Sequence, residues 1–555
     1  MDNIFIFQIR RIGDFFQSIP LINGLYKKNQ DGNVPGKIDI AIDESLTDIK
    51  RLFNDNIKLH TLEELTSAGN TDPSLDNFNP SLFFNFLDNY RPYISKFLKK
   101  YNLAVNLNHD IKTSLFMDFF DDAEKKGFIS INKSEKPSDA ILRKGAPNYL
   151  YNSIKNRSLN KINIVDIFSF IGLGMPAEIK KKYEAFNPEY LNLDKKRIKK
   201  TPKSNRKFRI CISPGASSIK RVWHPESYAR LIELLLKNIN SEIVIVGAAG
   251  ETGIAAEIKK YVPLEIAHMV LDITGKTSPS EIIYLLKDFD LIVSADTGTL
   301  HISQVLNVPA VSVFIGNSNF YETGPHLKNS YVIYSKAECY PCLENEPCRY
   351  NFGCKRDVNP QDVFHLAEMI LDGTKNKAAA KIISGNIKKG NFEAAVCKHI
   401  GSIHYFPLVK KEIGKNELAS EILKFSWIYV LSDVAVNPDL NRILQYTKKY
   451  YKNSKKAAVI LISEITFIKS VFENGKKCFA RSEGYKGEYF KKFAESVKSL
   501  GYNYGYLKLA VDYFIDEAVI PDAGYSEKHK LKILSKAFND IILLLDTALE
   551  ILGRL

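Results

Sequence analysis

The chain has few of the features that mark secreted or membrane-spanning proteins. Its seven cysteines are an odd number among 555 residues and are not spread like a disulfide framework. No apolar run reaches the roughly 18 residues of a membrane-spanning helix, and the longest candidate, near residues 541–545, is interrupted by Asp546. The N-terminus enters a strand-like run at Ile4 without a basic segment or a small-residue cleavage site, which argues against a signal peptide. These absences predict a protein of the reducing cytoplasm.

What the chain does have is an ordinary globular composition and an excess of positive charge. Apolar residues make up 45% and charged residues 25%, and the length predicts two or three domains. Of the net charge of +14, roughly +10 lies beyond residue 376. These cations either form the solvated surface of a helical domain or attract an anionic partner, such as acidic membrane lipid or a phosphorylated acceptor. No nucleic-acid-binding module is recognisable, so no nucleic-acid partner is expected.

Strand-like and helical segments alternate over most of the chain, which predicts α/β domains built on parallel sheets. The first such block covers residues 1–185. A lysine-rich stretch over 186–207 is typical of an exposed basic linker, and a second α/β block covers 208–375. Beyond residue 376 the alternation fades, so residues 376–555 are predicted to form a mainly helical, basic extension.

The segment from Asp296 to His301, with the sequence DTGTLH, is the most informative motif. It follows a short apolar run typical of a buried parallel strand and precedes a helical pattern. In an open α/β sheet ligands bind at such a loop, where the free N–H groups of a helix N-terminus attract phosphate. The alternative is an ordinary turn in which Asp296 and Thr297 cap the helix.

Other small or charged residues follow predicted strands of the second block. Lys220 and Arg221 carry charges that could neutralise a leaving diphosphate. Glu251 follows a strand that ends at Gly247, and an acid at this place accepts hydrogen bonds from ribose hydroxyls in dinucleotide-binding folds. The order of these residues within one predicted domain indicates a binding site more strongly than any one of them does alone. With the first motif, the candidate donor-binding residues are Ser213, Gly215, Gly247, Glu251, Lys276, Thr277, Asp296, Thr297, Gly298, His301 and Gly316.

In this order the motifs resemble those of glycosyltransferase family 9, the ADP-heptose:lipopolysaccharide heptosyltransferases. The resemblance covers about residues 1–372 and leaves the extension outside. Two segments depart from the family pattern, at 106–108, where asparagines replace the usual acid, and at 317–319, where the Pro-containing loop is missing. The matching segments are those that begin at Ile9, Ser18, Val105, Lys112, Gly127, Ser213, Gly247, Gly275, Asp296, Gly316 and Gly324.

The resemblance implies a GT-B fold, in which two Rossmann-like domains face each other across a cleft. The first domain would hold the acceptor and the second the nucleotide sugar, in an inverting transfer that requires no cofactor for catalysis. Such a transfer needs a base for the acceptor hydroxyl, and Asp14 is our prediction, against the alternative that it caps a helix. Lys220 is predicted to offset charge on the diphosphate, against the alternative of a surface lysine. The predicted acceptor-binding residues are Arg11, Gly13 and Asn108.

Four cysteines, Cys339, Cys342, Cys348 and Cys354, lie close together in the sequence. Four thiolates satisfy a tetrahedral zinc or an iron site, and the resemblance implies a structural iron among protein-heptosylating relatives. The alternatives are free thiols in a loop or redox-labile pairs. A structural metal is therefore one prediction for this segment, and a catalytic metal is not expected.

These observations predict a heptosyltransferase that moves heptose from ADP-heptose to the lipopolysaccharide inner core. It would act in the cytoplasm, with the basic extension in peripheral contact with acidic lipid of the inner membrane. Three alternatives stay open. The first is a protein O-heptosyltransferase acting on a surface protein, the second a non-catalytic GT-B interaction protein, and the third a nucleotide-sugar epimerase.

Overall fold

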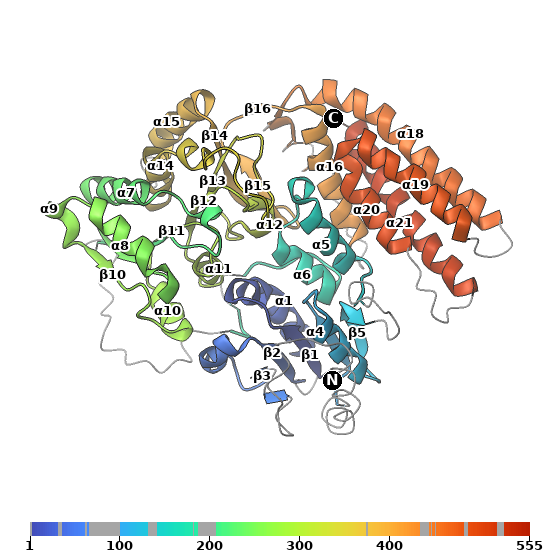
Figure 1. The fold of residues 1–555 in the computed structure, drawn as a ribbon, viewed down its shortest axis with the longest axis horizontal. Helices are drawn as coiled ribbons and strands as arrows, with labels where there is room; N and C mark the ends of the chain where they lie inside the picture. The colour runs from blue at the N-terminus through green and yellow to red at the C-terminus, as the bar shows by residue number, and fades with distance from the viewer. Residues whose placement is uncertain are drawn as a thin grey trace.

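The computed structural model contains two large, mainly parallel sheets and a helical C-terminal region (Figure 1). Most of the predicted basic linker lies outside the described residues. Within the described part of the chain, no helix is both long and apolar enough to cross a bilayer. The described residues are 3–30, 36–61, 64–65, 100–130, 141–180, 183–186, 207–372, 376–432, 443, 445, 447–449, 451–481, 487–518 and 527–554.

The N-terminal sheet has five parallel strands in the order β3-β2-β1-β4-β5. Side chains alternate along its central strand: Ile4 and Ile6 enter one apolar cluster, whereas Phe5 and Phe7 enter another on the opposite face. Both faces are therefore covered, as a parallel sheet requires. The strands are β1 (Ile4–Gln8), β2 (Ile38–Ile42), β3 (Ile57–Thr61), β4 (Leu103–Asn106) and β5 (Glu124–Gly127). The associated helices are α1 (Ile12–Gln30), α4 (Ile111–Phe116), α5 (Ala146–Lys155), η4 (Arg157–Leu159) and α6 (Ile164–Leu173).

The second sheet has eight strands in the order β10-β9-β8-β11-β12-β13-β14-β15. The strands from β8 to β13 pair in parallel, and β14 and β15 add an antiparallel hairpin at one edge. This hairpin lies beyond residue 375, so the sheet continues past the end predicted for the nucleotide-sugar domain. The strands are β8 (Phe208–Ser213), β9 (Ser241–Ile245), β10 (Val270–Asp272), β11 (Leu291–Ser294), β12 (Ala310–Phe314), β13 (Tyr331–Ser335), β14 (Phe392–His399) and β15 (Ile403–Pro407).

The helices of this second half follow the strands in alternation. They include α7 (Pro225–Asn238), α8 (Thr252–Tyr261), α10 (Pro279–Leu286), α11 (Gly298–Val305), α12 (Phe320–Thr323), α14 (Pro360–Leu371) and α15 (Asn376–Lys389). In each sheet the strand order reverses direction beside the first strand, between β1 and β4 and between β8 and β11. Ligands of open α/β sheets bind at the carboxyl ends of strands at such switch points.

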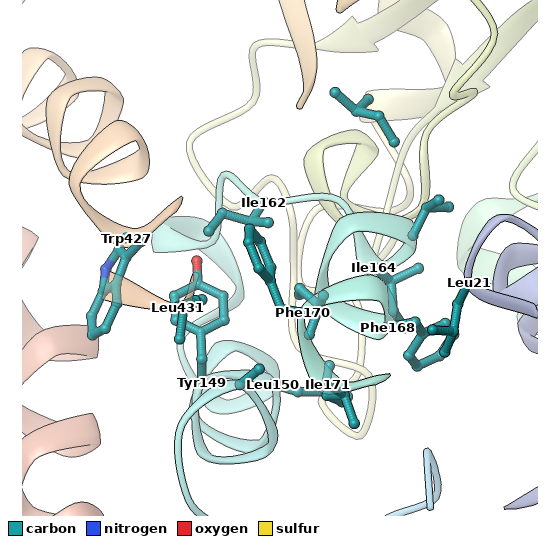
Figure 2. Packing of buried hydrophobic residues seen from close by; sticks show 14 of the residues in the cluster. Leu21, Tyr149, Leu150, Ile162, Ile164, Phe168, Phe170, Ile171, Trp427 and Leu431 are labelled. Atoms are coloured by element: carbon teal, nitrogen blue, oxygen red, sulfur yellow. The ribbon is translucent and has the colours of Figure 1, made fainter. Parts of the chain in front are cut away.

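The helical C-terminal region shares a core with the N-terminal half rather than forming a separate unit. Trp427 of α16 packs against Tyr149 of α5, with ring centroids 5.0 Å apart (Figure 2). Tyr513 of α20 also packs against Trp427, with ring centroids 4.8 Å apart. One apolar cluster runs from Ile4 to Leu552. The sheets and helices confirm the predicted GT-B fold class with its mainly helical C-terminal region. The helices of this region are α16 (Lys415–Val430), α18 (Ser454–Arg481), α19 (Gly487–Asn503), α20 (Lys508–Ala518) and α21 (Glu527–Gly553).

Candidate active site

The loops that follow β1 and β11 meet where the two halves of the molecule face each other. A Cβ atom built on Gly13 would lie 2.9 Å from the His301 ring, and one built on Gly298 would lie 2.6 Å from the Ile12 side chain. Both glycines are therefore required for this close approach of α1 and α11, which lie together at the centre of Figure 1. The structure thus brings the predicted base loop and the DTG motif into direct contact.

Asp14 lies in the first turn of α1, beside this contact. Burial raises the pKa of its carboxyl group, while the charges of His301, Arg10 and Arg11 oppose that rise. The nearby carboxylate of Asp296 raises the pKa of Asp14 further. A carboxylate with a raised pKa is a better proton acceptor, so this environment suits a general base.

Asp296 lies in the β11–α11 loop with one carboxylate oxygen beside Arg221 and the other near His301. Its Oδ2 atom accepts a hydrogen bond from Nη1 of Arg221 at 3.2 Å, and its Oδ1 atom is 3.5 Å from Nε2 of His301. Burial by itself raises the pKa of Asp296, but the hydrogen bond with His301 and the charge of Arg221 outweigh it, so the pKa is lowered. Asp14 and Asp296 therefore have pKa values moved in opposite directions, a pattern that separates a base from a carboxylate that stays ionised.

His301 and Thr297 complete this loop. His301 is buried, and its Nδ1 atom has no hydrogen-bond partner among the described residues, which is unusual for a buried polar atom. The Thr297 hydroxyl caps α11 by accepting from the amide of Leu300 at 3.4 Å. It also lies 3.4 Å from the hydroxyl of Ser213 at the end of β8. Thr297 thus caps α11 with Ser213 beside it, and donor binding by these two residues stays a prediction.

Glu251 lies over the ends of β8 and β9. A side chain added at Gly215 or at Gly247 would overlap its carboxylate, so both glycines make room for this acid. The carboxylate accepts a hydrogen bond from the amide of Ala248 at 2.8 Å, and burial raises its pKa. Three predicted donor-side residues therefore come together here.

Lys276 and Thr277 lie in the loop before α10, directly after Gly275, whose amide donates to the Gly247 carbonyl at 2.9 Å. The Lys276 ammonium donates to the Asp272 carbonyl at 3.0 Å, which is a contact within its own loop.

Lys220 and Arg221 are adjacent in the sequence but have different surroundings. The buried Lys220 ammonium donates to the carbonyl oxygens of Leu343 at 2.8 Å, Glu344 at 2.9 Å and Glu346. An ammonium group has three donors, so all of them are used by this loop. Arg221, not Lys220, is the cation beside Asp296, and the diphosphate role of Lys220 stays a prediction that this arrangement does not favour.

The predicted acceptor residues divide between the domain contact and internal structure. The Arg11 side chain reaches across to the second half and donates to the hydroxyl of Ser217 at 3.2 Å. Asn108 is buried, and its side-chain carbonyl accepts from the amide of Ile9 at 3.2 Å. Its amide donates to Asn106, so the side chain joins the loops after β1 and β4 rather than pointing to a ligand.

The four clustered cysteines lie in the segment between β13 and α14, tied to Gly316 by a hydrogen bond from the Cys342 amide at 3.0 Å. Burial raises the pKa of Cys354, and the charges of the other three thiols raise it further, so the four lie near one another. Among the described residues, however, no group of three or more His, Cys, Asp or Glu side chains is arranged to hold a metal ion. The present arrangement of these cysteines does not fit the predicted zinc or iron.

Sequence reasoning missed Arg157, Asn317 and Glu322, which join this site to the helical region. Arg157 follows α5, some 160 residues from its partners in the sequence. The departure noted at residues 317–319 was the one local signal, since it placed polar side chains after β12.

Two Rossmann-like, mainly parallel sheets whose strand-end loops meet are the arrangement of a GT-B fold. Residues 98–351 match glycosyltransferase family 9 (heptosyltransferase). The predicted resemblance to this family is thus confirmed over that range. The loop that carries Asp14 lies outside the matched residues.

Curated proteins and solved structures that are similar to this chain bear heptosyltransferase names. Lipooligosaccharide heptosyltransferase 2 of Campylobacter jejuni is 28% identical over 171 residues, 30% of this chain and 52% of that protein. The protein of the same name from Haemophilus influenzae is 28% identical over 166 residues, 29% of this chain and 45% of that protein. The chain therefore spans about half the length of the curated relatives it matches. The structure of E. coli ADP-heptose lps heptosyltransferase II aligns with 67% of this chain and 99% of that chain, at 16% identity and a TM-score of 0.43.

Proposed function

We propose that this chain is an inverting heptosyltransferase that uses ADP-heptose and acts on the lipopolysaccharide inner core. One observation carries the proposal: Asp14 and Asp296 lie at the contact between the two halves, with pKa values moved in opposite directions. A glycosyl transfer needs one carboxylate that accepts a proton and surroundings that hold an anionic donor. The family match and the curated relatives named above support heptose as the transferred sugar.

In the proposed reaction the acceptor hydroxyl loses its proton to the Asp14 carboxylate as its oxygen attacks the anomeric carbon of the heptose. The bond from that carbon to the diphosphate oxygen breaks, and ADP departs with the electron pair. Arg221 and the free N–H groups at the start of α11 offset the charge on the diphosphate. Asp296 stays ionised and holds Arg221 and His301, while Glu251 is placed to accept hydrogen bonds from ribose hydroxyls.

An anionic acceptor is supported by a group of cations around His109, in the loop after β4. Arg143 Nη1 lies 3.1 Å from His109 Nε2, and Arg10 donates to the His109 carbonyl at 3.1 Å. The cationic groups of Arg143 and Lys155 each lie 3.9 Å from the centre of the Tyr151 ring. Burial, and then the charges of Arg143, Arg10 and Lys155, lower the pKa of His109 to about 4. Since Arg10 also influences Asp14, these cations adjoin the proposed base.

Arg143→Met is expected to raise the KM for an anionic acceptor by roughly 10-fold or more, because a charge-assisted hydrogen bond contributes about 1.5–3 kcal/mol. The donor KM should not change. Initial rates at several acceptor and salt concentrations measure both effects, and the salt dependence should weaken in the variant. Lys58→Met, which removes an exposed cation of β3, is the matched control. An equal effect of the two variants would contradict an acceptor role.

Calorimetric titration with ADP-heptose, ADP and a UDP-sugar, followed by a transfer assay, tests the proposed function. We expect ADP-heptose to bind and a lipopolysaccharide core lacking the terminal heptose to be modified. Transfer only to a surface protein would instead establish the protein O-heptosyltransferase alternative. Absence of binding to any nucleotide would favour the non-catalytic alternative. The proposed place of action is the cytoplasmic face of the inner membrane, where the basic extension contacts acidic lipid.

A further inference from the structure

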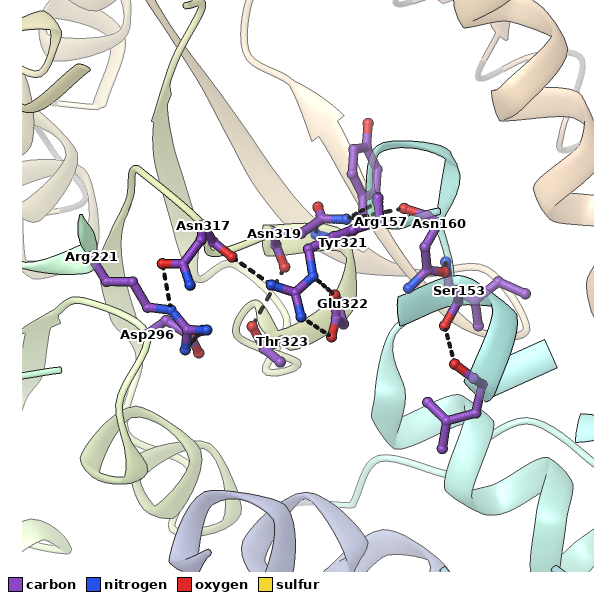
Figure 3. Close-up of polar contacts among 12 residues, drawn as sticks. Ser153, Arg157, Asn160, Arg221, Asp296, Asn317, Asn319, Tyr321, Glu322 and Thr323 are labelled. Carbon is purple, nitrogen blue, oxygen red and sulfur yellow. Dashed lines mark hydrogen bonds and ion pairs between the residues drawn. The ribbon is translucent and has the colours of Figure 1, made fainter. Parts of the chain in front are cut away.

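A buried network of charges connects the end of α5 with the donor side of the site (Figure 3). Arg157, on η4, donates from Nη1 to the backbone carbonyl of Asn317 at 2.7 Å. The same guanidinium pairs with Glu322 of α12, with Nε 3.0 Å from Oε2 and Nη2 3.5 Å from Oε1. The two side chains are only 16% and 11% exposed. One guanidinium therefore holds both ends of the segment that follows β12.

The network continues from Asn317 to the site itself. The side-chain oxygen of Asn317 accepts from Nε of Arg221 at 3.1 Å, and Nη1 of Arg221 donates to Asp296. Asn317 thus accepts hydrogen bonds from two arginines, one on each side of the domain contact. Burial raises the pKa of Glu322, and the Arg157 charge opposes that rise. Arg157 therefore counteracts the effect of burial on Glu322, whose carboxyl group lies near Asp296.

The C-terminal helical region is hydrogen-bonded to the segment that carries Arg157. The Asn156 and Asn152 amides of α5–η4 donate to Asp512 and Asp516 of α20 at 2.8 Å and 2.9 Å. Lys508 of the same helix donates to the Asn156 side chain at 3.0 Å. The segment that carries Arg157 is therefore anchored on α20.

The helical region also contacts α12 directly. The Tyr321 hydroxyl donates to Glu421 of α16 at 2.9 Å, and Lys161 pairs with the same carboxylate at 3.4 Å. Tyr321 and Glu322 are neighbours on one short helix, so α12 is held from one side by Glu421 and from the other by Arg157.

We propose that Arg157 is a positioning residue through which the C-terminal helical region orders the donor-side segment 316–323. This inference deepens the proposed function and rests on it. Arg157 acts through Asn317 on Arg221 and Asp296, and it does not itself touch the substrate. The helical region is then part of the donor site's support, in addition to any role toward the acceptor.

Three variants separate positioning from simple stabilisation. Arg157→Met leaves the Glu322 carboxylate buried without its partner, so it should lower the unfolding temperature. It should also raise the donor KM by about 10- to 100-fold, because the Asn317 carbonyl loses a charged donor. The double variant Arg157→Met/Glu322→Met should recover the unfolding temperature while the donor KM stays high. Tyr321→Phe should raise the donor KM by a smaller factor, roughly fivefold, as a neutral hydrogen bond implies.

Recovery of the donor KM together with stability in the double variant would overturn the positioning role, as would an unchanged donor KM in Arg157→Met. An unchanged donor KM in Tyr321→Phe would overturn the part assigned to the helical region. Arg230→Met, at an exposed position of α7, is the matched control. Hydrogen exchange of segment 316–323 gives a readout that does not depend on the proposed function. Faster exchange in both Arg157 variants supports the inference even if the wild type fails to bind ADP-heptose, and unchanged exchange contradicts it.

Discussion

Asp14→Asn is expected to lower the transfer rate by about 10²–10⁴-fold, the contribution typical of a general base, while ADP-heptose still binds. The amide occupies nearly the same space but cannot accept the proton of the acceptor hydroxyl. Single-turnover transfer and calorimetric titration measure the two effects separately. The transfer rate should also depend on pH. Burial raises the pKa of Asp14, so the rate should begin to fall at a higher pH than the protonation of an ordinary aspartate would cause.

Asp55→Asn, at an exposed position of the same half, is the control for a change of net charge. Full transfer activity in Asp14→Asn would reject this residue as the base. Loss of donor binding together with transfer would instead show that Asp14 supports the contact between α1 and α11, as a capping or structural carboxylate would.

Arg221→Met is expected to destabilise the protein by about 3–5 kcal/mol at neutral pH, because it leaves the buried Asp296 carboxylate without its closest cation. It should also weaken donor binding, since Arg221 faces the proposed diphosphate site. Asp296 has a lowered pKa in the folded protein, so its ion pair stabilises the fold above the unfolded pKa of about 3.9 and is lost as pH falls through the folded value. The stability difference between wild type and variant should therefore be largest near neutral pH and shrink as the solution is acidified.

Urea unfolding at a series of pH values measures this effect. The double variant Arg221→Met/Asp296→Asn is the matched control, because it has no buried carboxylate to leave unpaired. A stability loss in Arg221→Met that does not change with pH would mean that packing, rather than the ion pair, accounts for the contribution of this side chain.

Local sequence pattern was sufficient to place the elements whose structure depends on residues close together in the chain. The strand that begins at Ile4 and the strand before Asp296 lie where the apolar runs predict them. The small residues after those strands are at carboxyl ends, where the topology places ligand sites. Gly13 and Gly298 show why small residues suit these places, since an added Cβ would press on the His301 ring or the Ile12 side chain.

Local sequence pattern was not sufficient where contacts with distant segments decide which of two similar side chains faces the site. Lys220 and Arg221 are both cations on one 3-10 turn, and only the packed loop at 343–346 decides that Lys220 turns away from Asp296. Asn108 is predicted to bind the acceptor, and only the structure shows that its amide donates to Asn106 within the N-terminal half. The cysteines illustrate the same limit, because their spacing suits a metal whereas their packed arrangement does not present a ligand set.

The sequence by itself determined the α/β class, the positions of the strand-end loops and the identity of the two aspartates, because these depend on periodicity and on residues a few positions apart. Only the tertiary structure decided which charges meet. Arg157 lies about 160 residues from Asn317, and α20 lies more than 350 residues from the asparagines of α5 that it holds. Such pairings arise when the apolar faces of distant helices are buried together, as Trp427 is between Tyr149 and Tyr513. The polar groups beside them must then find partners across the same contact.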